Sequence, residues 1–196
     1  MHRYFILHKP ANMVSQFISS HQVNLLGNID FQFPEGTHAI GRLDNHSEGL
    51  LILTTNKAIT RKLFQGEVPH TRKYLVQVRH TVIEDTLQKL REGVSIRVRG
   101  GDFYTTLPCN VELVKNPYDY VESKEYAIEY EASTWLMLTL TEGKFHQVRK
   151  MVDIVGHKCK RLIRIAIEDI YLDKLLPGQI RELGEEEFFA LLKMKK

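Results

Sequence analysis

Short apolar runs alternate with polar turns along the chain, and their spacing predicts the strands of a sheet. The clearest strand is residues 134–141, where leucines occupy every second position, and residues 73–80 alternate in the same way. Four consecutive apolar residues at 50–53 lie between glycine and asparagine, which is typical of a strand buried on both faces. Further strands are expected at residues 3–8, 94–98, 103–107, 109–114, 158–167 and 170–172.

Apolar residues at helical spacing predict four helices between these strands. Asn56 is placed to cap a helix over residues 57–64, and Thr81 with Glu84 has the spacing of a capping box. That second helix should end at Gly93, since glycine favours the conformation that closes helices. Two more helices are expected at residues 145–155 and 185–193. Strands that come in pairs as well as alternating with helices favour an α+β fold with a mixed, mainly antiparallel sheet.

The length of 196 residues suits a single domain over residues 1–196. Hydrophobic residues make up 43% and charged residues 26%, which is an ordinary globular composition. No apolar run is long enough to cross a membrane, and the N-terminus lacks the features of a signal peptide. Cys109 and Cys159 are far apart, which indicates reduced thiols and a cytoplasmic protein.

The net charge of +3 says less than its distribution along the chain. Residues 144–164 carry seven cations and one acid, while acids collect in residues 119–131 and 182–187. A local basic surface on a nearly neutral protein is typical of a face that binds a polyanion such as RNA. A solvated basic helix face explains the same pattern equally well. The cations are Lys144, Arg149, Lys150, Lys158, Lys160, Arg161 and Arg164.

Asp44 occupies a turn just before the buried strand at residues 50–53. A carboxylate at the mouth of a rigid element is well placed for catalysis, because rigid scaffolds hold loop residues in position. Aspartates in turns most often have only a structural role, so the position alone does not identify a site.

The surroundings of Asp44 change that assessment. Residues 41–51 (G-R-L-D-N-H-S-E-G-L-L) resemble the signature of the RsuA/RluE-type pseudouridine synthases, and three further blocks match in the same order. These blocks are Lys9-Pro10, residues 72–76 (R-K-Y-L-V), and residues 142–151 (E-G-K-F-H-Q-V-R-K-M) followed by Leu162-Ile163-Arg164. The chain is closest to the stand-alone RluE-like branch. It departs from the pattern at Glu168-Asp169, where relatives often have glycine, and this departure blurs the subfamily.

The resemblance implies a central sheet and two subdomains with a catalytic cleft between them. It also implies isomerisation of a uridine in ribosomal RNA, with large-subunit (23S) RNA as the expected substrate. Asp44 would be the catalytic carboxylate, paired with Arg149, and Tyr74 would stack on the uracil. The same resemblance implies that Leu162 packs beneath the base. Because the catalytic blocks begin with the first residues of the chain, no S4 RNA-binding domain is expected. Phosphate or base contacts are expected from Arg42, Lys144, Gln147 and Arg164.

The reaction keeps every atom of the base, so no cofactor is expected, and the isolated histidines lack the spacing of metal ligands. The expected partner is RNA, with no membrane association, and the expected state is a monomer. Two other readings stay open. One is an RNA-binding or ribosome-assembly protein that has this fold but no activity. The other is a nucleoside or glycoside hydrolase, which would need a second carboxylate beside Asp44, and Glu48 is the nearest candidate.

Overall fold

Most of the predicted strands join one mixed sheet, whereas those expected at residues 94–98 and 103–107 pair only with each other. The structure is a computed structural model that describes residues 2–65, 69–122 and 132–195. The strands of the main sheet are β1 (Tyr4–Lys9), β2 (His38–Ile40), β3 (Glu48–Thr54), β4 (Arg72–Arg79), β7 (Asn110–Val114), β8 (Ser133–Leu140), β9 (Cys159–Ile167), β10 (Ile170–Tyr171) and β11 (Ile180–Leu183). A separate two-stranded ribbon consists of β5 (Ser95–Arg97) and β6 (Phe103–Thr105).

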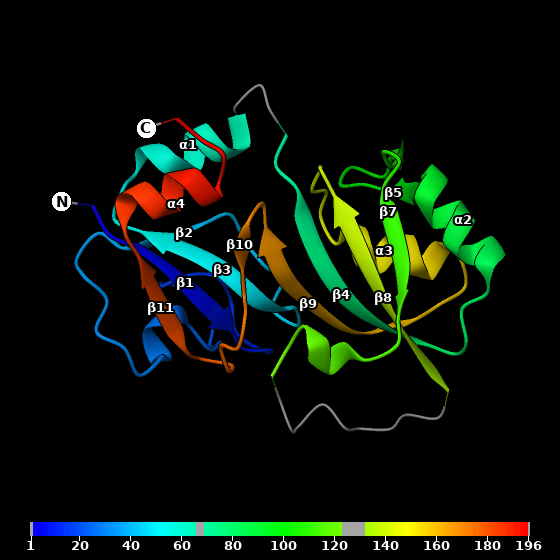
Figure 1. The fold of residues 1–196 in the computed structure, drawn as a ribbon, viewed down its shortest axis with the longest axis horizontal. Helices are drawn as coiled ribbons and strands as arrows, with labels where there is room; N and C mark the ends of the chain where they lie inside the picture. The colour runs from blue at the N-terminus through cyan, green and yellow to red at the C-terminus, as the bar shows by residue number, and fades with distance from the viewer. Residues whose placement is uncertain (1, 66–68, 123–131, 196) are drawn as a thin grey trace.

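The main sheet runs in the order β11-β1-β3-β9-β4-β8-β7, with β2 beside β3 and β10 beside β9. Figure 1 shows two halves, one built around β1 and β3 and the other around β4, β8 and β9. The halves meet where β3 pairs with β9, at Glu48↔Ile163 and Gly49↔Arg164. This pairing is parallel, whereas every other pairing between the named strands of the described ranges is antiparallel. The expected α+β fold with two subdomains is therefore confirmed.

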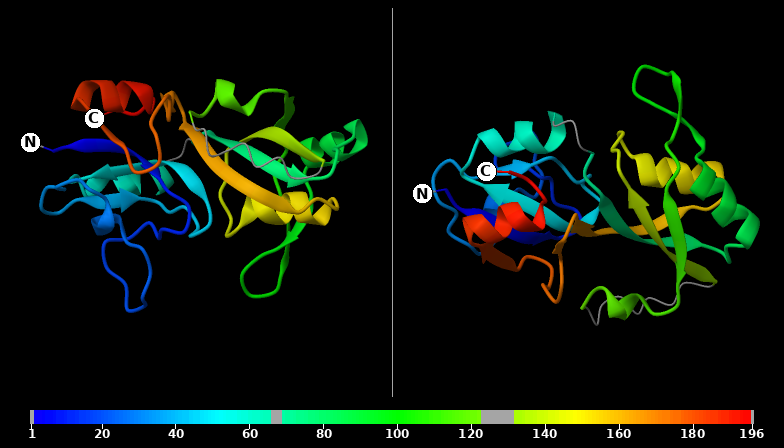
Figure 2. Two further views of the ribbon diagram at one scale, coloured as in Figure 1. Left: turned by 90° about the horizontal axis from the view of Figure 1, so that it is seen from below. Right: turned by 45° about the horizontal axis from the view of Figure 1, so that its top comes forward.

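In the part of the chain that the structure describes, four helices cover the sheet. Helices α1 (Ala58–Gln65) and α4 (Glu185–Leu191) lie on the half that contains both termini, and α2 (Glu84–Glu92) and α3 (Gln147–Ile154) lie on the other half (Figure 1). Short 3-10 turns occur at η1 (Leu26–Asn28) and η2 (Pro117–Asp119). Figure 2 shows η2 and α3 on opposite faces of the sheet. None of the helices in the described ranges is long and apolar enough to cross a membrane.

Alternation along the strands separates the core into clusters. Leu136, Leu138 and Leu140 of β8 pack with Leu162 in the cluster that contains α2 and α3. Met137 lies in the cluster on the other face, which also contains residues of α1 and α4. Burying apolar side chains on both faces fixes the strand register, because a slip of one residue would exchange the two sets.

Two local predictions about the helices have different outcomes. The Asn56 side chain caps α1, since its Oδ1 accepts a hydrogen bond from the Ala58 amide at 3.1 Å. The capping box of Thr81 with Glu84 is wrong, because α2 begins at Glu84 and has no side-chain cap. Residues 80–82 bond to β8 instead: the Val82 amide donates to the Thr134 hydroxyl at 3.1 Å.

Candidate active site

Asp44 lies in the turn between β2 and β3, and contacts from distant parts of the chain fix that turn. The Ser47 amide closes it by donating to the Asp44 carbonyl at 3.0 Å. The buried Ser15 hydroxyl both accepts from the Leu43 amide (2.9 Å) and donates to the Leu43 carbonyl (3.0 Å). These bonds hold the backbone while the Asp44 side chain stays 29% exposed, so its carboxylate is accessible from outside.

Lys9 supports the same turn from below. Its side chain is fully buried, and Nζ donates to the carbonyls of Pro10 (2.8 Å), Met13 (2.6 Å) and Asn45 (3.4 Å). Burial lowers the pKa of Lys9 to about 8, although the carboxylates of Glu48 and Asp44 act in the opposite direction. The Lys-Pro block at the start of the chain therefore has a structural role beneath Asp44.

The expected ion pair between Arg149 and Asp44 is not formed among the described residues, so that prediction needs correction. The Arg149 Nη2 donates to the His46 carbonyl at 3.0 Å and to the Ser47 hydroxyl at 3.3 Å. Arg149 lies on the first turn of α3, beside the residues that follow Asp44. Its guanidinium N–H groups therefore bond to these residues and not to the Asp44 carboxylate. The guanidinium positions the turn rather than the carboxylate.

A histidine contacts the carboxylate instead. The His146 Nε2 lies 3.4 Å from the Asp44 Oδ1, and the imidazole stacks on the ring of Phe145 with centroids 3.9 Å apart. Asp44 has no other ion pair within the described ranges. Sequence analysis missed this role, because neither spacing nor composition distinguishes His146 from the other histidines.

Tyr74 and Arg164 form the inner wall of the site from neighbouring strands, where Tyr74 of β4 pairs with Arg164 of β9. The Arg164 side chain is buried and donates from Nε to the Leu50 carbonyl at 2.8 Å. Burial lowers the pKa of Arg164, while the neighbouring oxygens of Tyr74 and the Asp44 carboxylate counteract that shift. The Arg164 Nη2 has no hydrogen-bond partner in the described chain, so one donor of this arginine is unused.

These side chains line a cleft of about 650 Å³. Seven of the eight residues proposed from sequence lie on its walls, and Arg149 is the exception. Sequence reasoning missed His70 and Arg72 before and within β4, and Glu142 and His146 next to α3. The predicted residues on the cleft walls are Arg42, Asp44, Tyr74, Lys144, Gln147, Leu162 and Arg164.

Among the described residues, the two further carboxylates considered for the site bind other groups. Glu48 is buried and takes part in a two-pronged ion pair with Arg161, with contacts of 2.8 and 2.6 Å. Glu142 lines the cleft, but it accepts bonds from the Tyr104 hydroxyl, the Leu107 amide and the Gln147 amide group. Glu48 and Glu142 are thus both engaged by other groups, which argues against the two-carboxylate mechanism of a glycoside hydrolase.

Gln147 and Lys144 shape the end of the cleft. Gln147 is buried, accepts from the Lys144 amide at 2.8 Å and donates to Glu142 at 2.7 Å. The Lys144 side chain is exposed, and its Nζ lies 4.4 Å from the centre of the Tyr104 ring. The lysine is thus free to reach a polyanion, whereas the glutamine amide is engaged within the turn.

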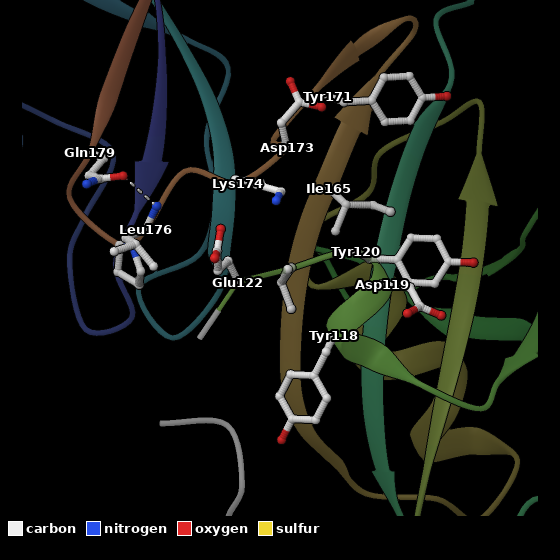
Figure 3. A pocket seen from close by; sticks show the side chains of 12 residues that line it. Tyr118, Asp119, Tyr120, Glu122, Ile165, Tyr171, Asp173, Lys174, Leu176 and Gln179 are labelled. Carbon is white, nitrogen blue, oxygen red and sulfur yellow. Dashed lines mark hydrogen bonds between the residues drawn. The ribbon is translucent and has the colours of Figure 1, made fainter. Parts of the chain in front are cut away.

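A larger cavity of about 1280 Å³ lies elsewhere (Figure 3). It is lined by residues of η2, by Ile165 and by the segment between β10 and β11, including Tyr118, Tyr120 and Tyr171. This cavity and the cleft share no lining residue, so the two are separate. It contains none of the predicted site residues, and chemistry rather than size identifies the candidate active site. Within the described ranges, no group of three or more His, Cys, Asp or Glu side chains is arranged to hold a metal ion.

Comparisons with known proteins place the chain as a whole among related sequences and structures. The family described as RNA pseudouridylate synthase matches residues 3–153. The ribosomal large subunit pseudouridine synthase E of Vibrio parahaemolyticus is 34% identical over 92% of this chain and 74% of its own length. The ribosomal small subunit pseudouridine synthase A of the same organism is 30% identical over 94% of this chain and 72% of its own length. A crystal structure of a pseudouridylate synthase superposes with a TM-score of 0.78 and 27% identity, covering 97% of this chain and 74% of that one.

Proposed function

The chain belongs to the RNA pseudouridylate synthase family, and we propose that it converts one uridine of large-subunit (23S) ribosomal RNA to pseudouridine, with Asp44 acting at the ribose. The observation that carries this proposal is an accessible carboxylate on a rigid turn, at the wall of a cleft that also holds Tyr74, Leu162 and several cations. Identity to the relative named for the large subunit is 34%, against 30% to the one named for the small subunit, and this difference favours the large subunit.

The reaction breaks the bond between N1 of uracil and C1′ of ribose, turns the base and joins C5 to C1′. Breaking the bond develops positive charge on the sugar, as in glycoside hydrolysis. Asp44 either bonds to C1′ as a nucleophile or takes a proton from C2′ as a base. Both routes require an ionised carboxylate that is already in position, which agrees with the bonds that hold the turn from Lys9 and Ser15.

The cleft suits a single extruded nucleotide. Its volume of about 650 Å³ is in the range of small-molecule sites, and a uridine within folded RNA must leave its stack before C1′ is reachable. Tyr74 offers a ring for stacking on the uracil, and the buried Leu162 provides an apolar floor. The Tyr74 hydroxyl assists proton transfer at C5 in this proposal.

The remaining wall residues divide between the RNA backbone and the site itself. Arg42 and Lys144 are exposed at the cleft and bind phosphates. Arg164 is buried and contributes positive potential beside Asp44 and Tyr74. Arg149 and Gln147 act indirectly, by fixing the Asp44 turn and the turn before α3.

Tritium release tests this proposal. The protein is incubated with large-subunit ribosomal RNA transcribed with uridine tritiated at C5, since replacement of the C5 proton accompanies isomerisation. We expect release by the wild type and none by Asp44→Asn, with RNA binding by the variant retained because the cations of the cleft are unchanged. Small-subunit RNA, run in parallel, tests the choice of subunit.

The other readings give different results in the same assay. RNA binding without tritium release by the wild type would indicate a protein that binds RNA but does not modify it. Free uracil among the products would indicate hydrolysis. The proposal also includes action in the cytoplasm and a monomeric state. Light scattering of the purified protein with and without RNA would test whether it is a monomer.

A further inference from the structure

His146 has a left-handed backbone conformation, which is uncommon for residues other than glycine, although histidine adopts it more often than most. It precedes α3 with φ 55 and ψ 28, in the left-handed region where glycine and asparagine are the usual occupants. Its side chain makes no capping bond to the helix, so helix formation does not explain the choice of histidine. Backbone strain of this kind often accompanies function, provided that a contact of the side chain requires it.

That contact is with Asp44. The His146 Nε2 lies 3.4 Å from the Asp44 Oδ1, with the two side chains 41% and 29% exposed. Phe145 stacks on the imidazole at an interplanar angle of 19°, and the Lys150 Nζ lies 5.4 Å from the centre of the Phe145 ring. These neighbours limit the rotation of the imidazole and keep one of its nitrogens toward the carboxylate.

We propose that His146 is the positioning residue of Asp44, holding the carboxylate toward the ribose through an N–H that Nε2 donates. This inference rests on the proposed role of Asp44 at the ribose. Either the protonated ring or the tautomer with hydrogen on Nε2 makes this bond. The distance exceeds that of a tight N–H···O bond, as is common for catalytic contacts before a substrate binds. Arg149, expected to hold the carboxylate, holds the neighbouring backbone instead.

Two substitutions separate the donated bond from the backbone conformation. His146→Gln retains an N–H donor of similar reach, whereas His146→Leu has none, and both side chains bear the same left-handed backbone. A hydrogen bond to a charged group is worth roughly 10-fold or more in rate, so we expect His146→Leu to reduce the single-turnover rate of tritium release by about 10-fold or more. His146→Gln should stay within about 3-fold of the wild type, since a neutral donor retains part of that bond. Half-saturating concentrations of the large-subunit RNA transcript should change by less than about 2-fold, because the contact is with the enzyme's own carboxylate.

A third variant distinguishes positioning from a structural role. His146→Gly relieves the left-handed backbone and should raise the midpoint of thermal unfolding, yet it should slow tritium release as much as His146→Leu. A residue that only supports the fold would not give a more stable and slower enzyme. Equal rates for His146→Leu and the wild type, equal losses for His146→Leu and His146→Gln, or a loss confined to RNA affinity would each overturn the inference.

Asp44→Asn, measured alongside, separates this inference from the proposed function. If Asp44→Asn still releases tritium, the role of Asp44 fails and the role of His146 fails with it. If Asp44→Asn is inactive while His146→Leu matches the wild type, only the inference about His146 is overturned.

Discussion

Gly49 lies where the two halves of the sheet approach most closely, and replacing it with alanine should destabilise the protein strongly. A Cβ at this position would lie 2.3 Å from the Arg164 carbonyl oxygen, 2.8 Å from the Arg164 amide nitrogen and 2.9 Å from the Ile163 Cγ2. Two of these atoms belong to the backbone of β9, which cannot move aside as the end of a flexible side chain could. Gly49 also has a φ of +98°, where residues with a side chain are strained.

Both effects contribute to the expected loss. A residue held in a sparsely populated backbone region costs about 1–3 kcal/mol, and forcing extra atoms into a packed interior costs about 1–3 kcal/mol more. We therefore expect Gly49→Ala to lower the free energy of unfolding by about 2–6 kcal/mol, a large part of the ~5–15 kcal/mol typical of a domain. Gly36→Ala is the matched control, because Gly36 has a φ of +78° but no atom within 4 Å of an added Cβ.

Urea denaturation, followed by fluorescence of Trp135, gives the free energy of unfolding of each variant from its midpoint and slope. The difference between the two alanine variants isolates the close approach of β3 and β9, since both carry the cost of a positive φ. Gly49→Ala should also lose tritium release at temperatures where it remains folded, because the displaced strand carries Arg164 of the cleft. If Gly49→Ala loses no more stability than Gly36→Ala, the argument from close packing is refuted.

Two further predictions concern charges around the cleft. The pKa of Lys9, lowered to about 8 by burial, means that the unfolded chain binds more protons above pH 8, so the free energy of unfolding should rise from pH 8 to 9 and Lys9→Met should remove that rise. This prediction is limited to pH 8–9, because burial raises the pKa of Cys109 and Cys159 to about 11. Above pH 9 these thiols ionise in the unfolded chain before they do in the folded one, so the free energy of unfolding should then fall. Arg42→Ala and Lys144→Ala should each weaken RNA binding and reduce by about 1 the slope of log affinity against log salt concentration, measured by fluorescence titration, with the single-turnover rate at saturation little changed. An unchanged slope would mean that neither side chain contacts phosphate.

The strands that sequence reasoning found are those whose pattern is local. Residues 133–140 and 72–79 alternate clearly, since each has one face against α3 and the other against the opposite cluster. Strand β11 was missed because its four residues, partly charged, become a strand only through pairing with β1 at the other end of the chain. Residues 115–132, to which no strand was assigned, connect two paired strands, β7 and β8, and residues 123–131 of this connection lie outside the described part.

The cap of α2 failed for a related reason. The spacing of Thr81 and Glu84 is favourable for a capping box, but the segment before α2 is already bonded to β8. The Asn56 cap was predicted correctly because nothing but α1 competes for the Asn56 side-chain oxygen among the described contacts. A local signal is reliable only where no distant element offers its donors and acceptors a better partner.

The same distinction explains what was right and wrong about the site. Motif blocks identified the residues that line the cleft, because each block fixes the face of one strand or the start of one helix. They did not determine which side chain contacts Asp44, since Arg149 and His146 both lie near the start of α3 and differ by less than one helical turn. That choice depends on the left-handed backbone at His146 and on the His46 carbonyl that receives Arg149. The bond from Arg149 joins α3 to the turn that carries Asp44, so it exists only once the two halves of the sheet have met.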